Sequence, residues 1–221
     1  MKILVAGGTG LVGTELLKIL AQRSNLHVTA LVRRHPSPEL CLEHIHYLPF
    51  NYENEQDFDK LVSESFDVVF CALGTTRKKA GSAQQFVKVD FEYPRRLIDA
   101  LVSTLPLLCV VSSVGADRPS GLYLRTKAAL EQHIMQSGMR YVILRPSLLL
   151  GARREFRLRE WLAAKCSRPL QKILRSSLGG KSAIYAPIDA AEVARAMVIA
   201  ALDHPPHSGG VILQGRDLLK H

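Results

Sequence analysis

The sequence predicts an α/β fold, a single doubly wound parallel sheet with helices on both faces. Short apolar runs alternate with longer segments of helical periodicity along the first 150 residues. Near-continuous apolar strands separated by helices indicate a parallel sheet, because both faces of each strand are then buried. The 221 residues, 47% of them apolar, are enough for one large domain with a sizeable core.

Each expected strand is a short apolar run, and most are followed by a segment with apolar residues at helical spacing. The first such unit is the strand Ile3–Ala6 followed by the helix Leu11–Gln22. The next strands are expected at His27–Val32, Ile45–Phe50, Asp67–Ala72, Leu107–Ser112 and Tyr141–Leu144. Further helices are expected at about 54–63, 82–103 and 124–137. Pro94 should kink the second of these helices, and Gly138 should end the third.

After Pro146 the alternation weakens. A basic, partly helical region at about 152–176 leads to a helix at about 189–202, with Asp189 as its expected N-cap, and to a late strand, Val211–Gln214. We therefore predict one domain, 1–221. Its cofactor-binding core would span 1–150, and a small C-terminal substrate-side extension, 151–221, would end in the closing helix and strand.

The net charge of +9 is unevenly spread. Between Gly151 and Arg175 there are six Arg, two Lys and two Glu, a net of +6. This segment is either a solvated helix face or a surface that attracts an anionic substrate, a phosphate-rich partner or an acidic membrane. Phe156 and Trp161 are its only aromatic residues, so no nucleic-acid partner is expected. We expect a small-molecule substrate of anionic character.

Cellular location can also be predicted. No apolar run reaches the ~18 residues of a membrane span, and the apolar N-terminal run is shorter than the roughly 7–15 residues of a signal peptide. The four cysteines are scattered without a C-x-x-C pair. These features predict a reduced, cytoplasmic protein without integral membrane association or a metal site. The sequence leaves a homodimer open.

Glycines directly after the first strand predict a dinucleotide-binding loop. They form the pattern G-x-x-G-x-x-G between a strand and a helix. Glycine allows the backbone to approach a pyrophosphate closely, and the helix N-terminus supplies free N–H groups. The residues expected to bind the cofactor here are Gly7, Gly8, Thr9, Gly10, Leu11, Val12 and Gly13.

The end of the second strand predicts which dinucleotide is bound. NAD sites usually place a carboxylate there for the ribose 2′-hydroxyl, whereas this strand ends in Arg33 and Arg34. A guanidinium can pair with a 2′-phosphate in a bidentate manner. We therefore expect NADP(H) to be preferred over NAD(H).

A catalytic group is predicted at the end of the fifth strand and in the following helix. Ser113 closes that strand, and Tyr123 and Lys127 are four residues apart, so their side chains share a helix face. An ammonium near a phenol favours the phenolate and lowers the phenol pKa from ~10. Tyr123 is then the expected acid/base, and Ser113 the hydrogen-bond donor to the same substrate oxygen. Ser112, Tyr123 and Lys127 are also expected to contact the cofactor.

Together, these residues resemble those of the short-chain dehydrogenases/reductases, Rossmann-fold enzymes, in their atypical or extended form. Several stretches are similar to the oxidoreductase family of the human Tat-interacting protein 2 and its bacterial relatives. These stretches are Cys71–Arg77, Ala80–Gly81, Phe86–Asp90, Ser112–Asp117, Leu122–Leu124 and Glu160–Leu162. The resemblance extends over nearly the whole chain.

The resemblance implies further roles. Leu73, Gly74 and Thr75 would line the adenosine and ribose path. Asn51 would bond the adenine ring in place of an aspartate, and the Arg145-Pro146 turn would lie near the nicotinamide. Asp90 stands where many relatives have an asparagine that holds a water chain to the lysine.

The function expected from these features is NADP(H)-dependent oxidation or reduction of a carbonyl/alcohol pair on a small molecule. Two alternatives remain open. One is a regulatory protein that senses NADP(H) and acts through a protein partner, and the other is an NADP-dependent isomerase, epimerase or dehydratase. An intact Ser113, Tyr123 and Lys127 set favours an enzyme.

Overall fold

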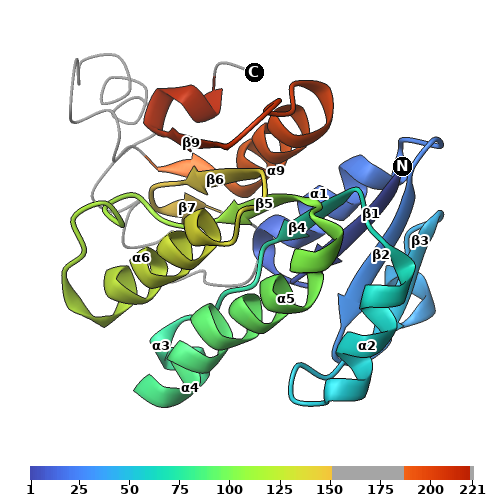
Figure 1. Ribbon diagram of the computed structural model, residues 1–221, viewed down its shortest axis with the longest axis horizontal. Coiled ribbons are helices and arrows are strands. Elements are labelled where there is room, and N and C mark those ends of the chain that lie inside the picture. The colour runs from blue at the N-terminus through green and yellow to red at the C-terminus, as the bar shows by residue number, and fades with distance from the viewer. Residues whose placement is uncertain (151–186, 220–221) are drawn as a thin grey trace.

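A computed structural model describes residues 1–150 and 187–219 of the chain. Its main feature is a seven-stranded parallel sheet in the order β3-β2-β1-β4-β5-β6-β9 (Figure 1). The strands are β1 Lys2–Ala6, β2 His27–Val32, β3 Ile45–Pro49, β4 Val68–Cys71, β5 Leu107–Val111, β6 Tyr141–Arg145 and β9 Gly210–Gln214. The predicted doubly wound Rossmann fold is confirmed, and all seven predicted strands are present.

Helices cover both faces of the sheet (Figure 1). One face carries α1 Leu11–Ala21 and α9 Ala190–Val198, and the other carries α2 Glu55–Glu64, α5 Tyr93–Leu101 and α6 Gly121–Gln136. Two short helices, α3 Arg77–Ala80 and α4 Ala83–Val87, follow β4. Because the strands are apolar on both faces, the molecule has two hydrophobic layers, one on each side of the sheet.

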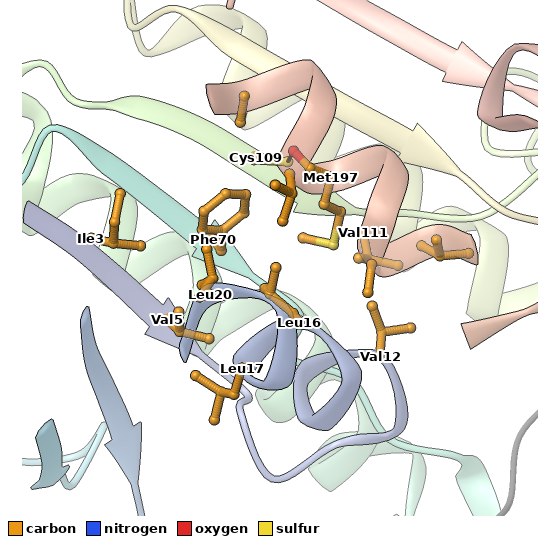
Figure 2. Packing of buried hydrophobic residues seen from close by; sticks show 14 of the residues in the cluster. Ile3, Val5, Val12, Leu16, Leu17, Leu20, Phe70, Cys109, Val111 and Met197 are labelled. Carbon is orange, nitrogen blue, oxygen red and sulfur yellow. Dashed lines mark hydrogen bonds between the residues drawn. The ribbon is translucent and has the colours of Figure 1, made fainter. Parts of the chain in front are cut away.

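The layer beneath α1 shows why the first predicted unit folds as it does (Figure 2). Leu16 and Leu20 recur at helical spacing on α1 and pack against Phe70 of β4 in the same cluster. Met197 of α9 belongs to the same cluster and faces α1 across it. All four side chains are buried. The packing fixes the start of α1 and therefore the glycine loop between β1 and α1.

The predicted helix 82–103 is interrupted, which refines the expected kink at Pro94. α4 passes into a π-helical turn, Lys88–Glu92, before α5 begins at Tyr93. Proline has no N–H with which to bond the carbonyl four residues earlier, so the chain ahead of it adopts a wider turn. In that turn the N–H of Tyr93 donates to the carbonyl of Lys88. Such π-turns are frequent at functional sites, and this one carries Asp90.

The helix and the strand that the sequence predicts for the C-terminal part are both present, as α9 and β9. Asp189 caps α9 in a capping box with Glu192. β9 pairs in parallel with β6. The sequence did not predict the small second sheet, β7 Leu149–Leu150 with β8 Ile188–Asp189. The basic region, 151–175, and the helix expected at 152–176 lie outside the described residues. Within the described ranges, no helix is both long and apolar enough to span a membrane.

Candidate active site

The predicted site residues gather at the carboxyl ends of the strands. The strand order reverses between β1 and β4, and the loops after these two strands diverge at this point. In open α/β sheets ligands bind in the crevice that such a reversal creates. The glycine loop follows β1, the Leu73–Thr75 segment follows β4, and Ser113 follows β5.

The glycine loop packs its backbone tightly against the segment after β4. Gly7 has a φ of 84°, and a Cβ atom there would lie 2.6 Å from the carbonyl oxygen of Ala72. A Cβ atom at Gly13 would lie 2.1 Å from the carbonyl oxygen of Gly7. Because both neighbours are backbone atoms, neither position accepts a side chain without moving the loop.

The N-terminus of α1 has the properties of an anion-binding site. Gly10 occupies the N-cap, no side chain among the described residues caps this end, and the first turn contains no acidic residue. The first N–H groups of the helix therefore remain without an intrahelical partner. The loop and helix dipole fit a dinucleotide pyrophosphate.

We predict that replacing Gly13 with alanine disrupts cofactor binding. The added methyl group would displace the carbonyl of Gly7 and with it the loop. The expected result is a rise of roughly tenfold or more in the NADPH dissociation constant, the size of one or two lost hydrogen bonds to a charged group. Fluorescence titration with NADPH measures this constant. Gly81→Ala is the control. Its φ of 78° puts an alanine under local backbone strain, but a Cβ atom there has nothing within 4 Å, so the substitution leaves the glycine loop untouched. Unchanged NADPH affinity in Gly13→Ala would contradict the predicted loop.

Lys127 and Asp90 form a buried ion pair beside the segment after β4. Lys127 Nζ lies 3.0 Å from Asp90 Oδ1, and the two side chains are 5% and 1% exposed. The other carboxylate oxygen, Oδ2, accepts a hydrogen bond of 2.7 Å from the backbone N–H of Thr75. A Cβ atom at Gly74 would lie 3.8 Å from Lys127 Nζ. The structure thus brings Lys127 to Gly74 and Thr75, two residues of the implied ribose path.

Tyr123 lies in the first turn of α6, one helical turn before Lys127. The helix begins at Gly121, three residues earlier than predicted, so the expected shared helix is present. Tyr123 is 42% exposed, and its ring lies 5.9 Å from that of Phe86 on α4. No hydrogen bond among the described residues joins Tyr123 to Lys127 or Ser113. The tyrosine is therefore open to a small molecule, whereas the lysine is enclosed.

Ser113 is held beside the Arg145-Pro146 turn. The N–H of Val114 donates to the carbonyl of Pro146 over 3.0 Å, and the N–H of Ser112 donates to that of Leu144 over 2.7 Å. The Ser113 hydroxyl is partly buried and makes a long, 3.3 Å hydrogen bond to the carbonyl of Val114. This weak local bond leaves the hydroxyl available to another acceptor.

A second buried network lies beneath Ser113 and was not predicted. The Arg145 guanidinium donates to both carboxylate oxygens of Glu131, with Nε distances of 3.0 and 3.2 Å. The Ser112 hydroxyl also donates to Glu131. The hydrogen bond to Glu131 raises the pKa of Arg145 above its ordinary value, although burial acts against it. The expectation for Arg145 concerned its backbone near the nicotinamide; its side chain points to Glu131. No local spacing signals this network, because Glu131 and Arg145 lie on different elements, α6 and β6.

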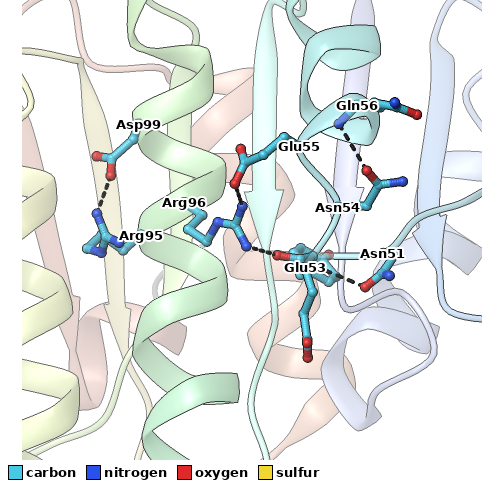
Figure 3. A network of polar contacts seen from close by, with 9 residues as sticks. Asn51, Glu53, Asn54, Glu55, Gln56, Arg95, Arg96 and Asp99 are labelled. Atoms are coloured by element: carbon cyan, nitrogen blue, oxygen red, sulfur yellow. Dashed lines mark hydrogen bonds and ion pairs between the residues drawn. The ribbon is translucent and has the colours of Figure 1, made fainter.

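Asn51 follows β3, on the far side of the predicted site from Ser113. Its Oδ1 accepts the N–H of Glu53 over 3.0 Å, which closes the turn after β3 (Figure 3). Its side-chain amide nitrogen makes no hydrogen bond with another described residue. Arg96 of α5 holds the same turn by donating to the carbonyl of Tyr52 and to Glu55 (Figure 3).

Arg33 and Arg34 are exposed directly after β2. Neither guanidinium makes a hydrogen bond or ion pair with another described residue. Burial raises the pKa of Tyr93 to about 12, its hydrogen bond to Glu53 adds to the rise, and the positive charge of Arg33 opposes it. Arg33 therefore lies near Tyr93, whose phenol donates to Glu53 in the turn after β3.

The fold and the matched family together define an NAD(P)-binding α/β protein with a Rossmann fold. Residues 7–159 match the model of a family described as NAD(P)H-binding, and the chain belongs to this family. Protein HTATIP2 of Rattus norvegicus is 38% identical over 172 residues, which cover 74% of this chain and 69% of that protein. The predicted resemblance to the Tat-interacting protein 2 family is confirmed.

Two fungal proteins named FMP52, mitochondrial, are also similar. The Candida albicans protein is 36% identical over 160 residues, 70% of each chain. The Coccidioides immitis protein is 31% identical over 243 residues, which cover 98% of this chain and 94% of the relative. These mitochondrial names contradict the expected cytoplasmic location. That expectation rested on the short apolar run at the start of the sequence and on the scattered cysteines, neither of which separates a mitochondrial protein from a cytoplasmic one.

Solved structures share the fold at low sequence identity. A UDP-glucose 4-epimerase from Thermotoga maritima aligns with a TM-score of 0.72 at 16% identity, covering 97% of this chain and 77% of the other. A short-chain dehydrogenase/reductase superfamily protein from Agrobacterium tumefaciens with bound NAD aligns with a TM-score of 0.70 at 20% identity, with the same coverage. At this identity the likeness shows the fold alone.

Proposed function

We propose that the protein is an NADP(H)-dependent oxidoreductase that acts on a carbonyl/alcohol pair of a small molecule. The arrangement of Tyr123 and Lys127 carries this proposal. The exposed phenol lies one helical turn from a buried ammonium, which itself lies against Gly74 at the strand ends. A purely structural helix has no need of a charged lysine in this position, because burying the charge is costly.

The proposed roles follow from this placement. When bound, the cofactor would supply or accept a hydride. Tyr123 would give its phenolic proton to a carbonyl oxygen during reduction, or take the proton of an alcohol during oxidation. Ser113 would donate a hydrogen bond to the same oxygen. Lys127 would stabilise the phenolate by its charge and donate to the nicotinamide ribose.

The remaining residues would hold the cofactor. We propose that Gly7–Gly13 bind the pyrophosphate, that Leu73, Gly74 and Thr75 line the ribose path, and that Asn51 donates to the adenine. The end of the cofactor site that receives the nicotinamide would be formed by Ser112, Arg145 and Pro146. The Glu131 network would hold the first two of these in place. The division into a core at 1–150 and a substrate-side extension at 151–221 is part of this proposal.

Cofactor preference gives a direct prediction. Arg33 and Arg34 would favour NADPH over NADH by about 1.5–3 kcal/mol, the range for hydrogen bonds to charged groups. Arg33→Ala should remove most of that difference, because the 2′-phosphate of NADPH would lose its bidentate contact with the guanidinium. Isothermal titration calorimetry with both cofactors measures the difference. Arg95→Ala is a matched control, since that arginine pairs with Asp99 on α5. Equal wild-type affinities for NADPH and NADH would contradict the preference.

Turnover tests the function itself. Purified protein with NADPH and a panel of aldehydes, ketones and keto acids should consume NADPH, measured by its absorbance. Keto acids should rank high if the substrate is anionic. If NADPH binds but no member of the panel is reduced, and no alcohol is oxidised with NADP⁺, the oxidoreductase proposal fails in favour of cofactor sensing.

A further inference from the structure

Asp90 is the one acidic side chain that contacts Lys127 among the described residues, and it contacts the loop after β4 as well. Its two oxygens serve different partners, since Oδ1 lies 3.0 Å from Lys127 Nζ and Oδ2 accepts from the Thr75 N–H over 2.7 Å. The carboxylate therefore joins three segments of the chain, the π-helical turn 88–92, the segment 73–75 and helix α6.

Both partners of Asp90 are hydrogen-bond donors, and this requires a carboxylate rather than an amide. A carboxylate offers two acceptor oxygens, whereas asparagine offers one oxygen and an NH₂ group. In an asparagine variant the NH₂ group would face either the Thr75 N–H or the Lys127 ammonium. One of the two contacts would then be lost. Asparagine has nearly the same size, so the variant removes charge and one acceptor without leaving a cavity.

We propose that Asp90 is a positioning residue that keeps Lys127 charged and aimed at the cofactor ribose before the cofactor arrives. This inference rests on the proposed function and deepens it. A buried lysine without a counter-ion tends to lose its proton, because burial penalises the charged form. With the counter-ion in place, the ammonium stays charged, and its N–H groups that do not face Asp90 can donate to ribose hydroxyls. The same carboxylate fixes Thr75, so the ribose path and the ammonium are held as one unit.

The other titratable groups around Lys127 do not replace Asp90. On α6, Tyr123 lies one turn before Lys127 and is exposed, and Glu131 lies one turn after it and is bound to Arg145. On β4, Cys71 is buried, and burial raises the pKa of its thiol to about 11. That thiol is neutral below this pH and supplies no counter-charge. Asp90 is therefore the negative charge that faces the ammonium from a neighbouring element.

The first test uses the protein without cofactor and does not depend on its activity. Chemical denaturation is measured for four proteins: wild type, Asp90→Asn, Lys127→Met and the double variant. The unfolding midpoint of each protein is determined at several pH values between pH 6 and pH 10. Asp90→Asn should lower the midpoint, and adding Lys127→Met should restore much of it, because the unpaired charge is gone. The deficit of Asp90→Asn should shrink as pH rises toward about 10, where unfolded lysine also loses its proton. The sign follows because the unfolded variant binds more protons than the folded one, so stability rises with pH.

The second test measures NADPH binding by fluorescence across the same pH range. At pH 9, Asp90→Asn should bind NADPH roughly tenfold more weakly than wild type, since a neutral lysine loses its charge-assisted bond to the ribose. At pH 6 the two proteins should be closer. Asp67→Asn is the matched control, because Asp67 also accepts a backbone N–H, that of Lys2 over 2.7 Å, but at the amino ends of the strands. It should not change the pH dependence of binding.

The possible results are distinguishable. The inference would be overturned if the double variant lost the sum of the two single-variant losses in midpoint and if these losses did not depend on pH. This holds whether or not NADPH binds. Equal NADPH affinity of wild type and Asp90→Asn at pH 9 would also overturn it. Failure of wild type to bind NADPH at all would refute the proposed function, and the denaturation cycle would still decide whether Asp90 keeps Lys127 charged.

Discussion

Replacing Tyr123 with phenylalanine is expected to lower kcat by roughly 10²–10⁴-fold, the usual contribution of general acid–base catalysis. The substitution removes the proton that Tyr123 would exchange with the substrate oxygen. The ring itself remains, and with it the contact with Phe86 at 5.9 Å. Because the proposed pyrophosphate and adenine contacts lie on other residues, and the ring of Tyr123 stays in place, the dissociation constant of NADPH should stay close to the wild-type value.

Steady-state kinetics together with NADPH titration separate these two effects. Tyr141→Phe serves as the control, since Tyr141 begins β6 at the opposite end of the sheet. Its kcat should be unaffected. Wild-type turnover in Tyr123→Phe would show that another group transfers the proton and would remove Tyr123 from the mechanism.

Glu131→Ala is expected to cost about 3–5 kcal/mol of the free energy of unfolding, the range observed when one partner of a buried ion pair is removed. Arg145 would keep its charge, because a guanidinium stays protonated at any working pH. It would then be left buried without Glu131, the partner whose hydrogen bond raises its pKa in the native protein. The remaining acid, Asp117, lies 3.9 Å from Arg145 Nη1 and is half-exposed, so it replaces little of the loss. Ser112 would lose its acceptor as well.

Urea unfolding measures the Glu131 effect against a surface pair on another helix. Glu15 pairs with Lys18 on α1 at 2.9 Å, and both side chains are substantially exposed. Glu15→Ala should therefore cost no more than about 1 kcal/mol. A similarly small loss for Glu131→Ala would mean that water or a rearranged side chain satisfies Arg145, and that the network does not hold the end of β5 in place.

The sequence predicted the parts of the fold that depend on local patterns. Apolar strands and helical periodicity identified all seven strands of the main sheet, and the position of Asp189 identified the cap of α9. The β7–β8 pair could not be predicted, because two-residue strands have no periodicity and their pairing joins distant segments. The π-helical turn was visible only as a kink at Pro94, since a proline shows where a helix is disturbed but not which hydrogen-bond pattern replaces it.

The candidate site was predicted where its members lie close in sequence. The glycine loop and the Tyr123–Lys127 pair depend on short spacings, and the structure places both at the strand carboxyl ends. The contacts of Asp90 and Glu131 could not be predicted from local pattern, although the family resemblance did connect position 90 with the lysine. Asp90 meets Lys127 across 37 positions of the chain, and Glu131 meets Arg145 across 14. Tertiary packing, rather than local pattern, decides such contacts. The mitochondrial names of relatives corrected a location that composition alone could not determine.

The oxidoreductase proposal is tested most directly by a crystal structure of the protein with NADP⁺ bound. We predict the pyrophosphate against the Gly7–Gly13 backbone, the 2′-phosphate at Arg33, and the nicotinamide beside Tyr123, with Lys127 within hydrogen-bonding distance of its ribose. A nicotinamide facing away from Tyr123, or a cofactor bound elsewhere on the molecule, would contradict the proposed chemistry.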